Sequence, residues 1–146
     1  MNTFLRFLRL DFLPASADAG LLILRLWLGL SLGLLHGWSK FTGFSKMSGK
    51  FADPLGIGSQ ASLGLAVFGE LVCAALIVFG LFTRSAALAA AITMGVAFFV
   101  VHNMALSGPG NGELAFIYLA GFVTLFLTGA GKFSLDAAMG GRSRKN

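Results

Sequence analysis

The sequence predicts an all-α protein that crosses a membrane as a four-helix bundle. Of its 146 residues, 56% are hydrophobic and only 12% are charged, a balance far from that of soluble domains. Four apolar blocks, at about residues 20–38, 60–82, 85–102 and 113–129, approach the roughly 20 residues that a helix needs to span about 30 Å of hydrocarbon. None alternates as a membrane strand does, so in a lipid bilayer each block satisfies its backbone only as a helix. We expect one membrane domain over residues 1–146.

The first block carries small and polar residues on one side. At about 100° per residue, one helical face is predicted to hold Arg25, Gly29, Gly33, His36 and Lys40. Glycines spaced four apart allow two helices to approach closely. The residues before this block, 4–10, mix phenylalanine and leucine with two arginines, which is typical either of a short interfacial helix or of a frayed end.

The second and third blocks are separated only by Thr83 and Arg84. Such a short connection predicts a tight antiparallel hairpin with the arginine at the membrane surface. The third and fourth blocks are joined by residues 103–111, whose Ser-Gly-Pro-Gly run indicates an irregular loop.

The net charge of +5 does not indicate nucleic acid, because the basic residues flank the apolar blocks. The excess of lysine and arginine lies on the side of the two termini, which predicts that both are cytoplasmic in a bacterial-type cytoplasmic (inner) membrane. That side has Arg6, Arg9, Arg84, Lys132, Arg142, Arg144 and Lys145, whereas the other has Lys40, Lys46 and Lys50.

Arg25 and Glu70 lie inside apolar blocks, where an isolated charge costs several kcal/mol. They must therefore face protein, water or each other. We expect an ion pair between them, since a helical rise of about 1.5 Å per residue leaves an offset of roughly 8–10 Å. The pair would either fix the register of two helices or take part directly in function, and the sequence leaves both open.

A second polar group is expected at the outer ends of the helices, where the topology brings His36, Lys40, His102 and Glu113 near one surface. Histidine beside a carboxylate can pass protons or ligate a metal, and lysine can hold an anion. The alternative is that all four are interfacial anchors in contact with water. Two histidines are too few for a tetrahedral metal cage unless Cys73 or carboxylates contribute, and a single cysteine cannot form a dithiol, so we expect no metal site.

Several segments resemble the DoxX family in order and spacing. The first helix has an early arginine and ends in His36-Gly37-Trp38-Ser39-Lys40; the second carries Glu70 and ends in the turn 79–86; the third ends in His102-Asn103. The closing run Gly129-Ala130-Gly131-Lys132-Phe133-Ser134-Leu135-Asp136 is similar to a family signature in which proline stands at the position of Ala130. The resemblance covers about residues 20–137 and implies a four-helix membrane bundle.

The resemblance also implies a membrane redox role, since the family takes its name from a relative linked to thiosulfate oxidation with quinone as acceptor. Three hypotheses follow. The chain is a redox accessory subunit that binds a quinone, with Arg25, His36 or Lys40 as donor to its carbonyl; or it is a scaffold that holds a redox enzyme partner at the lipid bilayer. A small-solute permease, formed as a homo-oligomer, is the weakest.

Overall fold

The computed structural model describes residues 3–143, with side chains described up to residue 140, and within that range every element is helical. The all-α prediction is therefore confirmed. One continuous helix consists of α2 (Ala17–Leu32), η1 (Gly33–Gly37) and α3 (Trp38–Thr42). A second consists of α5 (Ser59–Val67), η2 (Phe68–Val72) and α6 (Cys73–Phe79), and a third of α7 (Thr83–Gly95) and η3 (Val96–Val101). The remaining helices are α1 (Thr3–Leu8), α4 (Phe44–Met47), α8 (Glu113–Thr128) and α9 (Leu135–Ser143).

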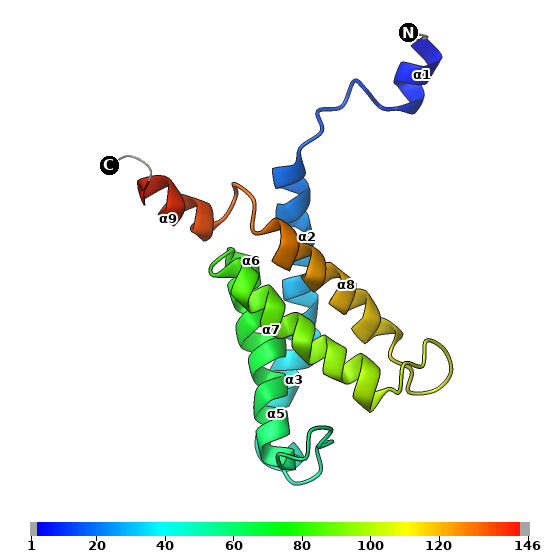
Figure 1. Ribbon diagram of the computed structural model, residues 1–146, viewed down its shortest axis with the longest axis vertical. Coiled ribbons are helices and arrows are strands. Elements are labelled where there is room, and N and C mark those ends of the chain that lie inside the picture. Colours follow the sequence, from blue (N-terminus) through cyan, green and yellow to red (C-terminus); the bar gives the residue numbers. More distant parts are fainter. Residues whose placement is uncertain (1–2, 144–146) are drawn as a thin grey trace.

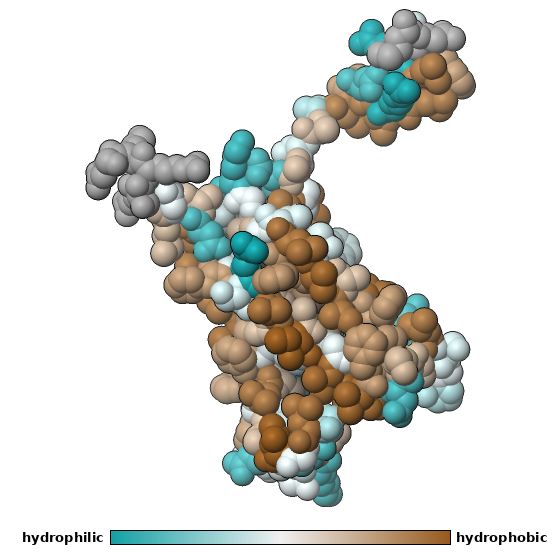
Figure 2. All heavy atoms as spheres, viewed as in Figure 1, coloured by the Kyte–Doolittle hydropathy of each residue, from teal (hydrophilic) through white to brown (hydrophobic). Residues whose placement is uncertain are grey.

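Three of the described helices are long and apolar enough to cross a membrane. They are Ala17–Thr42, Ser59–Phe79 and Thr83–Val101, with 26, 21 and 19 residues. The fourth expected span, α8, is equally apolar but has only 16 residues, or about 24 Å of helix. On the face seen in Figure 2, hydrophobic residues dominate the middle of the bundle and hydrophilic ones gather toward its ends. The chain is a membrane protein.

The long helices run antiparallel, so the chain has two opposite ends (Figure 1). The start of α2, the turn between α6 and α7, and α9 lie at one end, which we call the terminal end. The loops 43–58 and 102–112 lie at the other end, called here the loop end. Helix α1 stands away from the bundle, and its described side chains are exposed.

The interior is built mainly from small side chains. Alanines of α6 and α7 are buried against each other, and the larger buried residues of α8 pack onto α7. In a membrane, where lipid is as apolar as the core, such small residues stabilise a bundle by allowing close van der Waals contact. The central residues are Ala74, Ala87, Ala90, Phe122 and Leu125, each completely buried.

The predicted glycine face of the first helix contacts the second helix. A β-carbon added at Gly37 would lie 2.6 Å from the Glu70 carbonyl oxygen, and one at Gly29 would lie 2.6 Å from Val78 Cγ2. Between them, a β-carbon at Gly33 would make an ordinary 3.6 Å contact with Ala74. Gly37 thus faces Glu70, and the antiparallel register continues toward the start of α2. Gly33 lies opposite Ala74, and Gly29 lies opposite Val78.

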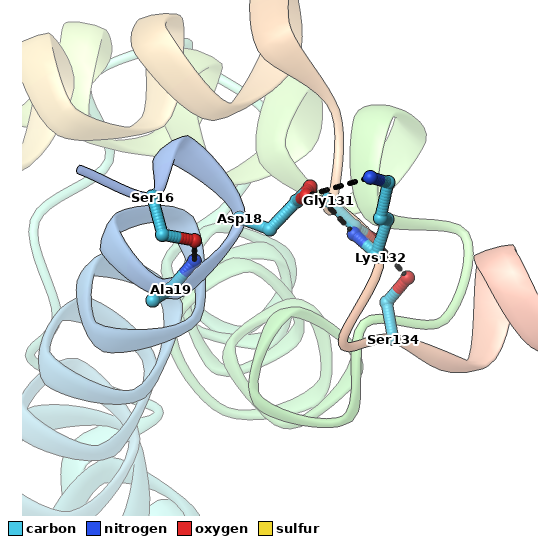
Figure 3. A network of polar contacts seen from close by, with 6 residues as sticks. All are labelled: Ser16, Asp18, Ala19, Gly131, Lys132 and Ser134. Carbon is cyan, nitrogen blue, oxygen red and sulfur yellow. Dashed lines mark hydrogen bonds and ion pairs between the residues drawn. The ribbon is translucent and has the colours of Figure 1, made fainter. Parts of the chain in front are cut away.

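The segment after α8 is held against the terminal end of the bundle. The Asp18 carboxylate accepts a hydrogen bond from the Lys132 backbone N–H at 2.9 Å and forms a 3.5 Å ion pair with Lys132 Nζ (Figure 3). The carboxylate of Asp136 accepts hydrogen bonds from the backbone N–H groups of Phe82 and Thr83, at 2.7 and 2.9 Å, and so caps the start of α7.

Candidate functional site

Arg25 and Glu70 are both buried, as expected, but the expected ion pair between them is not formed. The guanidinium of Arg25 donates to the backbone carbonyls of Ile77 and Phe133, and its side chain is completely buried. These carbonyls lie at the end of α6 and in the segment before α9, where the partial negative charge of a helix C-terminus favours a cation. Arg25 therefore ties three parts of the chain together at the terminal end.

The helix register explains why the pair is absent. Because Gly37 faces Glu70, Arg25 lies twelve residues (37 − 25), or about 18 Å, along the helix from the level of the carboxylate. The expected offset of 8–10 Å assumed a different crossing of the two helices. An arginine side chain cannot reach across the actual distance.

Glu70 is instead paired with Lys40. Lys40 Nζ lies 2.5 Å from Glu70 Oε2, and the two side chains are 19% and 9% exposed. Lys40 lies three residues after Gly37, near the loop end. Its long side chain extends back along the helix to the Glu70 carboxylate. A buried pair of this kind is neutral as a unit, which makes its position inside an apolar bundle tolerable.

Three polar residues of this region lie in or directly after a π-helical segment. His36 is in η1, Glu70 is in η2, and His102 directly follows η3, whereas Lys40 is in α3. A π-helical turn contains more residues than an α-helical turn, and such turns occur frequently at functional sites. Segments η1 and η2 also contact each other.

The predicted outer residues are only partly brought together. His36, Lys40 and His102 are each half-buried and border a common space with Glu70. Glu113, the first residue of α8, is exposed and lines neither of the cavities described below. Its backbone N–H is capped by the side-chain oxygen of Asn111 at 3.0 Å.

Two cavities meet at the Lys40–Glu70 pair. The larger, of about 470 Å³, lies between α5–η2 and α7–η3 beneath residues 51–55, and its wall is almost entirely apolar. The smaller, of about 280 Å³, lies between η1, η3 and α8. Lys40, Glu70, Ala97 and His102 line both. The ion pair and His102 thus form the polar end of a mostly hydrophobic cavity.

The larger cavity borders the outer apolar surface of the bundle. Leu65, Phe68 and Ile92 belong to its lining, yet they are 52%, 49% and 60% exposed. Side chains that line a cavity and also face outward mark an opening toward the hydrocarbon. The larger cavity is therefore partly open at this apolar surface.

Some residues of the site carried no signal in the sequence pattern. Tyr118 of α8 lines the smaller cavity, lies edge-to-face with His36 at 6.2 Å between ring centroids, and donates to Ser31 Oγ at 2.8 Å. Residues 51–55 cover the larger cavity from an irregular loop. Lys40 had a signal, since it shares a helical face with Gly33 and His36. In the part of the chain that the structure describes, no three His, Cys, Asp or Glu side chains are grouped to bind a metal.

A bundle of apolar helices that encloses an ion pair, flanked by two histidines, defines an integral membrane protein with an internal polar site. The DoxX family model matches residues 20–103, which include all three π-helical segments, and the chain belongs to the DoxX family. The match ends before α8 and the closing run 129–136.

Two relatives come from Haemophilus influenzae, and both are uncharacterised proteins. One is 36% identical over 114 residues, covering 70% of this chain and 78% of the relative. The other is 32% identical over 126 residues, covering 83% of each chain. No solved structure matches the chain significantly.

Proposed function

We propose that this protein is a redox-associated accessory subunit that binds a quinone in the larger cavity. The observation that carries the proposal is the combination of an apolar cavity of about 470 Å³, a polar end formed by Lys40, Glu70 and His102, and an opening lined by exposed apolar side chains. Cavities that bind small organic ligands have similar volumes and a similar division between apolar walls and a few polar groups.

A quinone matches this division. Its ring carries two carbonyl acceptors, and its isoprenoid tail is dissolved in the bilayer. One of the three N–H groups of Lys40 donates to Glu70, so the others can donate to a carbonyl oxygen. The tail would leave between Leu65, Phe68 and Ile92, where the cavity borders the apolar surface.

The orientation belongs to the same proposal. The terminal end of the bundle has Arg84 and Lys132, and the loop end has Lys40, Lys46 and Lys50. The sequence has its excess of lysine and arginine on the side of the two chain ends, which supports assigning the terminal end to the cytoplasmic side of an inner membrane. Helix α8 is assigned as a fourth crossing, for which the bilayer thins locally.

A partner enzyme would supply electrons. The chain has one cysteine, so it cannot cycle between a dithiol and a disulfide within one copy. A second candidate function, a scaffold for that enzyme, is favoured by α1, which stands away from the bundle with its described side chains exposed. The two functions differ in whether the isolated protein binds a quinone.

The test is binding of a short-tailed quinone to the full chain in lipid nanodiscs. We expect saturable binding that Lys40→Met weakens roughly tenfold, because one hydrogen bond from a charged donor contributes about 1.5–3 kcal/mol. Lys46→Met is the matched control, since Lys46 is exposed and lines neither cavity. A double variant, Lys40→Met with Glu70→Met, removes both charges and separates lost binding from a destabilised bundle. Absence of saturable binding by the folded wild-type protein would remove the quinone proposal.

A further inference from the structure

The imidazole of His102 has a defined tautomer. Its Nδ1 lies 2.7 Å from the backbone carbonyl oxygen of Gly110. A carbonyl oxygen can only accept a hydrogen bond, so Nδ1 must carry the proton. In the neutral ring, Nε2 then has a free lone pair and is a hydrogen-bond acceptor.

The loop after η3 holds this ring in place. The Gly112 N–H donates to the Ala105 carbonyl at 2.7 Å, closing the loop, and a β-carbon at Gly112 would lie 2.8 Å from His102 Cβ. Asn103 and Met104 both adopt positive φ, 49° and 59°, which non-glycine residues rarely do. Such conformations persist where the surrounding structure enforces them and are concentrated at functional sites.

The groups that face His102 include both charged and neutral side chains. Lys40 and Glu70 border both cavities with it, while His36 and Tyr118 face it only across the smaller one. A ligand in the larger cavity therefore borders the cationic donor Lys40 and also His102, whose Nε2 is the ring nitrogen left for it because Nδ1 is bonded to Gly110. Glu70 is already engaged with Lys40 through Oε2.

We infer that the larger cavity binds the reduced, hydroquinone form of its ligand in preference to the oxidised quinone. This inference rests on the proposed function. A quinone carbonyl oxygen can only accept hydrogen bonds. It can therefore accept one from Lys40, but it can form none with His102 Nε2, which is also an acceptor. A hydroquinone hydroxyl offers one proton and lone pairs, so it can donate to Nε2 and accept from Lys40. The unpaired acceptor is what disfavours the oxidised form.

The experiment compares binding of decylhydroquinone and decylquinone to the full chain in nanodiscs, under anaerobic conditions. At pH 8 we expect the hydroquinone to bind at least fivefold more tightly. His102→Ala should abolish the ratio at pH 8, whereas His36→Ala, which alters only the smaller cavity, should preserve it.

Each other outcome has a distinct meaning. Equal affinities for the two forms in the wild type at pH 8 would overturn the inference and leave quinone binding intact. A hydroquinone preference that survives in His102→Ala would overturn the assignment to His102. If neither form binds, the proposed function itself fails.

Discussion

Replacement of Gly37 by alanine should separate two helices that now touch at their backbones. The added β-carbon would lie 2.6 Å from the carbonyl oxygen, 2.7 Å from the carbonyl carbon of Glu70 and 2.8 Å from the nitrogen of Leu71. These are backbone atoms, so no side chain can rotate away. An ordinary contact of about 3.4 Å requires the helices to move apart by roughly 0.8 Å, and overpacking of this kind costs about 1–3 kcal/mol.

Gly33→Ala is the matched control on the same helix face. Its β-carbon would lie 3.6 Å from Ala74 Cβ and 3.8 Å from the Glu70 carbonyl oxygen, both ordinary contacts. Alanine is favoured over glycine in a helix by up to about 1 kcal/mol. We therefore expect Gly33→Ala to be neutral or stabilising, although the two glycines are only one turn apart.

The single cysteine provides the assay. Cys73 is 1% exposed and lies one turn from Glu70, so a fluorogenic maleimide reacts with it only when the bundle opens. At about 2–4 °C per kcal/mol, Gly37→Ala should lower the midpoint of thermal labelling by roughly 4–8 °C for a loss of about 2 kcal/mol. A midpoint equal to that of the wild type, or an equal decrease in Gly33→Ala, would refute the close-contact argument.

Three further outcomes are expected. Lys40→Met should destabilise the bundle by about 3–5 kcal/mol because Glu70 loses its counter-ion, and adding Glu70→Met should recover most of this in the same maleimide assay. Asp136→Ala should cost about 0.5–2 kcal/mol through the lost cap of α7, whereas the exposed Asp11→Ala should have no effect. Hydrogen bonds from Ser62 Oγ and from the Gly58 and Ile57 N–H groups lower the pKa of Asp53. They therefore stabilise the folded protein at pH values above the unfolded pKa of about 3.9, and this stability is lost as the pH falls through the lower folded pKa. The Gly58 amide resonance should accordingly titrate with a midpoint below that of an ordinary aspartate, and a midpoint at or above it would contradict this reasoning.

The sequence was sufficient for the helical class and for the glycine face of the first helix, but not for α8, whose buried residues are Ala115, Tyr118, Phe122 and Leu125. The apolar blocks are long enough to identify helices, and the regular spacing of Gly29, Gly33 and Gly37 marks the face that meets α6. The closing run from Gly129 to Asp136 also stood out, although the hydrogen bonds of Asp136 to the start of α7 depend on tertiary structure.

The partners of Arg25 and Glu70 could not be derived from either helix alone. Each helix has its own periodicity, but the level at which two helices cross depends on which small residue faces which backbone. Once Gly37 is placed on Glu70, Arg25 is too distant and Lys40 is the nearest cation on that face. The tautomer of His102 was equally inaccessible, because it depends on a loop carbonyl with no periodic signal.

The wide turn η1 lets the first helix carry one residue more between Leu32 and Trp38 than a regular α-helix would. A π-helical turn absorbs such an extra residue without rotating the residues after it. Deleting one residue there, for example the exposed Leu35, would therefore restore a regular helix and leave Lys40 directed at its carboxylate. Homologues with a single-residue gap at this position should accordingly retain both the lysine and the glutamate.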